Sequence, residues 1–143
     1  MIDALLTSPT TRMLEQTVNF TEQRHQVILT NIANASLPGY VQQDVSVEGF
    51  QKALQDAIDK GRSTYTGDVE PESNDTVDFQ PGSSLISVKP QATNRAMAFH
   101  DRGVRSMESL MGDLADNAMA HNTVAQLLKN RYDTMTKAIS MRV

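Results

Sequence analysis

Residues 104–139 decide the fold of this chain, and they read VRSMESLMGDLADNAMAHNTVAQLLKNRYDTMTKAI. Apolar residues recur in this stretch at alternating steps of three and four, a spacing that places them along one face of a helix. This C-terminal stripe consists of Val104, Met107, Met111, Leu114, Ala118, His121, Ala125, Leu128, Tyr132, Met135 and Ile139, widened by Leu110, Val124 and Leu127. The pattern predicts a helix on the order of 50 Å long that packs on other helices as a coiled coil.

A second helix is predicted near the N-terminus, from Pro9 to a point before Pro38. Ser8 suits the cap position and Pro9 the first helical position, whereas a residue that precedes a proline is disfavoured in a helix. Pro38 and Gly39 then predict a type II turn in which the glycine has a positive φ. The apolar stripe of this helix consists of Leu14, Val18, Thr21, His25, Ile28, Ile32 and Ala35, and residues 31–40 close it with the motif NIANASLPGY.

The middle segment, residues 41–103, has a different character. A short strand is expected at residues 44–47, a short helix at 49–60 and a second strand at 85–88. Residues 61–84 are polar and acidic, and we expect them to bury too little surface to offset the entropy of ordering. They form either a disordered loop or a surface that its neighbours order. The chain is therefore predicted to be mainly α, with residues 1–40 and 104–143 pairing as an antiparallel coiled coil around an irregular, partly flexible middle.

Composition excludes several classes of function. The 143 residues carry a net charge of −4, which disfavours nucleic acid as a partner because a phosphate backbone requires a basic surface. The chain has no cysteine, so disulfides and thiolate metal sites are excluded. No apolar run reaches the roughly 20 residues of a membrane span, and the first residues lack the basic start of a cleaved signal peptide.

The sequence motifs predict neither an enzyme nor a cofactor site. Phosphate-binding loops, nucleophile elbows and metalloprotease helices are absent from the sequence. His25 and His121 lie on the two apolar stripes, where they either share a metal or proton-sensing role or, as we favour, set the register of the helix pair. The acidic residues between Asp68 and Asp78 lack the ligand spacing of a calcium loop, which favours a solvated loop and no metal.

The motif at residues 31–40 resembles the sequence that closes the N-terminal helix in the rod proteins of the bacterial flagellar basal body. In that family two asparagines and small residues precede a Pro-Gly-Tyr turn. Residues 27–30 and Asp44-Val45 fit the same pattern, and residues 114–122, 127–129 and 138–139 resemble the terminal helix of its proximal rod members. The resemblance covers both ends, about half of the chain.

The resemblance implies a structural subunit that contributes to motility. Such a subunit is exported through the flagellar type III apparatus without a cleaved signal and assembles in the periplasm at the base of the rod. Its implied partners are further copies, other rod subunits, and components of the membrane ring and export gate. The expected assembly interface comprises the C-terminal stripe and the N-terminal residues Leu14, Val18, Ile28, Asn31, Ile32, Asn34, Pro38, Gly39 and Tyr40.

A second hypothesis is a soluble helical adaptor or export chaperone that holds a client on its long helix. A chaperone has no need of the small-residue helix end and turn at residues 31–40, so that motif favours the rod subunit.

Overall fold

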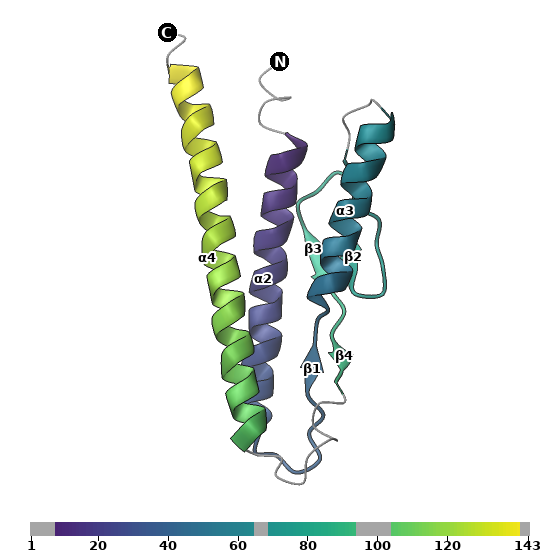
Figure 1. The fold of residues 1–143 in the computed structure, drawn as a ribbon, viewed down its shortest axis with the longest axis vertical. Coiled ribbons are helices and arrows are strands. Elements are labelled where there is room, and N and C mark those ends of the chain that lie inside the picture. Colours follow the sequence, from purple (N-terminus) through teal and green to yellow (C-terminus); the bar gives the residue numbers. More distant parts are fainter. Residues whose placement is uncertain (1–7, 65–68, 94–103, 141–143) are drawn as a thin grey trace.

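The computed structural model describes residues 8–64, 69–93 and 104–140, and Figure 1 shows their arrangement. Along the chain the elements are α2 (Pro9–Asn34), β1 (Gln43–Asp44), α3 (Val47–Thr64), β2 (Val77–Phe79), β3 (Ile86–Val88), β4 (Gln91–Ala92) and α4 (Val104–Ser140). Helices α2 and α4 lie side by side, while α3 and the strands lie on the other side of α2 (Figure 1). The fold is therefore mainly helical with an irregular middle, as predicted.

The two terminal helices run in opposite directions. Asn117, in the first half of α4, bonds to Thr21 near the middle of α2, whereas Arg131, near the end of α4, reaches Ser8 at the start of α2. Positions that come later in α4 thus meet positions that come earlier in α2, which confirms the antiparallel pairing.

The ends of α2 follow the sequence in part. Ser8 is the cap residue and Pro9 starts the helix, as predicted, but the expected capping bond from the Ser8 hydroxyl is absent. That hydroxyl instead accepts a hydrogen bond from Arg131 at 3.4 Å. After α2 the chain turns at residues 37–40, where the Tyr40 amide donates to the Leu37 carbonyl at 3.2 Å and Gly39 has φ +80°. The predicted Pro-Gly turn is confirmed.

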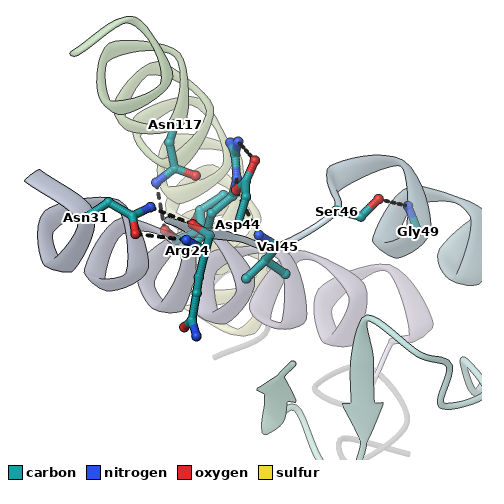
Figure 2. A network of polar contacts seen from close by, with 9 residues as sticks. Arg24, Asn31, Asp44, Val45, Ser46, Gly49 and Asn117 are labelled. Carbon is teal, nitrogen blue, oxygen red and sulfur yellow. Dashed lines mark hydrogen bonds and ion pairs between the residues drawn. The ribbon is translucent and has the colours of Figure 1, made fainter. Parts of the chain in front are cut away.

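The middle segment forms two small antiparallel ladders and one helix. β2 pairs with β3, and β1 pairs with β4. The chain changes its pairing partner between β3 and β4, at Pro90, a residue that has no amide hydrogen to give to a ladder. Helix α3 is longer than the predicted stretch 49–60, and Ser46 caps it by accepting a hydrogen bond from the Gly49 amide at 3.0 Å (Figure 2).

Most of the hydrophobic core belongs to this middle segment. Its buried members are Phe20 of α2 together with Val45, Phe50, Ala53, Val77, Phe79 and Ile86. Phe50 stacks on Phe20 with ring centroids 4.1 Å apart and on Phe79 at 6.0 Å. The expectation that residues 61–84 bury too little surface is therefore wrong for Val77 and Phe79. These two alternate inward on β2 with exposed Asp78, so a polar stretch still supplies two core side chains.

Candidate assembly interface

The seam between α2 and α4 is polar at its centre. The Asn117 side-chain amide donates to the Thr21 carbonyl at 2.8 Å, and Asn117 is buried. The Thr21 hydroxyl lies 2.9 Å from Nδ1 of His121, and 3.0 and 2.9 Å from the carbonyls of Thr17 and Val18. The hydroxyl can thus donate to a carbonyl of its own helix and accept from the imidazole. Directional bonds of this kind set the register of two helices more strictly than apolar packing does.

A second polar contact lies nearer the start of α2. The Tyr132 hydroxyl and the Ser84 hydroxyl both donate to the Glu15 carboxylate. The hydrogen bond to Glu15 raises the pKa of Tyr132 above its usual value, with burial and the charge of Glu15 acting in the same direction. Glu15 therefore connects α4 to the turn that precedes β3.

Helix α4 presents only one side of its stripe to α2. Leu110 and Asn117 are buried, and seven stripe residues are half-buried: Met107, Leu114, Ala118, His121, Ala125, Leu128 and Met135. Met111, Tyr132 and Ile139 keep 48%, 40% and 52% of their surface exposed. The sequence predicts an assembly interface along this stripe, and these three side chains keep surface that α2 does not cover.

Leu127 and Val104 were also expected on this stripe. Leu127, which was expected to widen the seam, is 50% exposed. The side chain of Val104 lies outside the described residues.

On α2 the predicted interface residues divide between two faces. Ile28 is buried, and Leu14, Val18 and Ile32 are half-buried. All four belong to the same apolar stripe of α2 as Thr21. Asn31 is only 2% exposed and lies on the side of the strands. Its amide donates to the Gln43 carbonyl at 2.5 Å and accepts from the Gln43 amide at 3.0 Å (Figure 2).

The closing motif acts within the chain. The Tyr40 hydroxyl donates to the Asn31 side chain at 3.0 Å, and Asn34 donates to the Thr30 carbonyl at 2.8 Å. Pro38 and Gly39 are exposed at the turn. The motif therefore ends α2, turns the chain and, through Asn31, hydrogen-bonds β1 to α2. The turn itself remains accessible to other molecules.

A second contact on this side of α2 could not be predicted from the sequence. Arg24 forms an ion pair with Asp44 through two hydrogen bonds of 3.2 and 3.5 Å (Figure 2). Both residues belong to polar stretches, and a solvated helix face has the same composition as one that bonds to a neighbouring strand. Only the three-dimensional positions of the two side chains reveal this ion pair.

The described residues contain no cluster of three or more His, Asp or Glu side chains that could hold a metal ion. His25 and His121 therefore form no metal site with a third such residue in this part of the chain. Two open hollows occur, of about 290 Å³ between α2, β1 and β3 and about 250 Å³ beside α3. None of the described helices has the length and apolar character needed to cross a membrane.

Comparisons with known protein families, with curated proteins and with solved structures find no match for this chain.

Proposed function

We propose that this chain is a structural subunit that assembles through its terminal helices. Within that class, the motif at residues 31–40 and the character of α4 favour a rod subunit of the bacterial flagellar basal body, of the proximal rod type. In this proposal the chain is exported by the flagellar type III apparatus and joins other rod subunits in the periplasm, at the base of the rod.

The observation that carries the proposal is the uncovered edge of the α4 stripe. Met111 and Ile139, near the two ends of the α4 stripe, stay exposed, and Tyr132 keeps 40% of its surface exposed although its hydroxyl bonds to Glu15 of α2. Leu29 of α2 is also exposed, at 45%. A neighbouring helix that lay along this edge would bury these side chains, and each Å² of apolar surface removed from water contributes roughly 25 cal/mol.

The experiment separates assembly from folding, because the tested positions are exposed. A strain that lacks the gene is complemented with Met111→Asp, with Ile139→Asp or with the control Thr123→Asp, a change at another exposed position of α4. We expect the two apolar-edge variants to fold normally yet to be absent from purified basal bodies and to leave the cells non-motile. Thr123→Asp is expected to restore motility.

A motile deletion strain, or a protein found only in the cytosol, would contradict the rod proposal. The alternative, a soluble helical adaptor or export chaperone, uses the same exposed edge to hold a client. It predicts that the protein copurifies with an exported substrate in the cytosol and is missing from basal bodies.

A further inference from the structure

Strand β3 has an open edge that faces α2. In the β2–β3 ladder the Lys89 amide donates to the Thr76 carbonyl at 2.8 Å, and Val77 pairs with Val88. Because the bonding direction alternates along an antiparallel strand, the Ile86 carbonyl and the Val88 amide point away from β2. These groups are the ones that another strand would bind.

Gln23 of α2 occupies that edge. Its side-chain NH₂ donates to the Ile86 carbonyl at 2.8 Å, and its side-chain oxygen accepts from the Val88 amide at 3.1 Å. A primary amide offers an acceptor oxygen and two donor hydrogens, so a single glutamine replaces the N–H and C=O that one residue of a neighbouring strand would supply. Asn31 does the same for Gln43 on β1, about two helical turns further along α2.

Three side-chain amides along α2 bond to β3 and to the turn that precedes it. Gln16 donates to the Ser83 carbonyl at 3.3 Å and Asn19 to the Ser84 carbonyl at 3.1 Å, which places both in line with Gln23. None of the eight residues that line the hollow between β3 and β1 is charged. Beside this hollow the strand edge is therefore protected without the charges that guard many edges, and the bonds to Gln23 take their place.

We propose that Gln23 blocks a self-association edge, and that β3 pairs with β3 of a second copy of this chain when α2 moves off the strand. An antiparallel pairing centred on Ser87 sets Ile86 opposite the partner's Val88. The Ile86 carbonyl then accepts from the partner's Val88 amide, and the Val88 amide donates to the partner's Ile86 carbonyl. These are the same two groups that Gln23 satisfies, so the dimer leaves neither of them unpaired. The inference is independent of the proposed rod function.

The chain has no cysteine, so one introduced cysteine reports the geometry. Ser87 is exposed, and the proposed two-fold axis brings both copies of this position into a directly opposed pair. Cα atoms in such a pair lie about 4.5 Å apart, within the range of a disulfide. Leu85, also exposed, lies off the axis, so Leu85→Cys serves as the geometric control.

The test compares two substitutions of similar shape on adjacent turns of α2. Gln23→Met removes both bonds to β3, whereas Gln26→Met changes an exposed glutamine with no side-chain hydrogen bond in the described residues. Under mild oxidation, Gln23→Met/Ser87→Cys is expected to form a disulfide dimer, and Gln26→Met/Ser87→Cys to remain a monomer. The Val88 amide in Gln23→Met should exchange with deuterium about fivefold faster, as the loss of one ordinary hydrogen bond implies.

Circular dichroism guards against a trivial loss of fold. If Gln23→Met does not fold, Gln23→Glu replaces it, because a carboxylate still accepts from the Val88 amide but cannot donate to the Ile86 carbonyl. A folded Gln23 variant that stays monomeric with Ser87→Cys overturns the proposal. Equal cross-linking through Ser87→Cys and Leu85→Cys also overturns it, since that result indicates random collision. Neither result bears on incorporation into basal bodies.

Discussion

The two long faces of α2 are held by different forces. Toward α4 the helix presents apolar and small polar side chains, among them Leu14, Val18 and Ile28. Toward the strands it presents amides and a guanidinium that bond to backbone or carboxylate groups, while Phe20 and Val27 reach the core cluster. Apolar contact is tolerant of small shifts, whereas hydrogen bonds set distance and direction. Both sides therefore position α2: the strand side through several bonds to backbone and carboxylate groups, and the α4 side through the bonds of Thr21 to Asn117 and His121, which are set among apolar side chains.

The largest effect should come from the core anchor on the strand side. Phe20→Ala removes a ring that is 2% exposed and stacks on Phe50, and it should lower the free energy of unfolding by about 3–5 kcal/mol. Leu29→Ala, at an exposed position of the same helix, is the control and should change it by less than about 0.5 kcal/mol. Urea denaturation measures both. Similar losses for the two variants would mean that Phe20 does not anchor α2.

Next in size is the asparagine that ties α2 to β1. Asn31→Ala leaves the backbone groups of Gln43 and the Tyr40 hydroxyl without their partner, and it should cost about 2 kcal/mol. Asn34→Ala is the matched control, because its side chain bonds only to the Thr30 carbonyl within α2. Thermal unfolding compares them. An Asn34→Ala protein as unstable as Asn31→Ala would show that the second asparagine of the motif carries equal weight.

A smaller loss is expected on the α4 side. Asn117→Ala removes the buried bond to the Thr21 carbonyl and should cost about 1 kcal/mol, while exposed Asn122→Ala should be nearly neutral. Hydrogen exchange can locate the loss: amides of α4 should lose protection before those of α3. Uniform loss of protection across both helices would indicate that the seam and the core unfold as one unit, and the contrast between the faces would then disappear.

The smallest effect concerns pH. Since the pKa of Tyr132 is raised in the folded state, its contribution to stability is complete below the usual tyrosine pKa and disappears as the pH rises through the raised value. The phenolate absorbance assigned to Tyr132, by difference from Tyr132→Phe, should titrate at higher pH than in a Glu15→Gln variant. An unchanged midpoint in Glu15→Gln would show that Glu15 does not cause the shift.

Sequence periodicity found the terminal helices and their pairing, because burial along a helix repeats at a spacing that is visible in one dimension. The residue types Pro38 and Gly39 likewise predicted the turn, in which Gly39 has a positive φ. Periodicity did not identify Leu110 and Asn117 as the most buried positions of α4. The stripe is symmetric about Leu114 and His121, and only the position of α2 selects one of its sides.

The strand side of α2 was not predictable in the same way. Gln23 and Arg24 have no periodic signature, and their partners lie far along the chain or across a turn. Val77 and Phe79 stand within an acidic stretch, so their burial could not be predicted from the local composition. They are buried because the β2–β3 ladder places them in one core cluster with residues of α3.

The sequence by itself determined that each end of the chain forms a long helix, that these two helices pair, and where the chain turns, because these depend on residue type and local spacing. Tertiary structure alone decided which edge of α4 stays uncovered, where the core lies, and that amides of α2 close the edges of β1 and β3. Those outcomes depend on directional bonds between residues up to 123 positions apart, and such bonds exist only once the chain has folded.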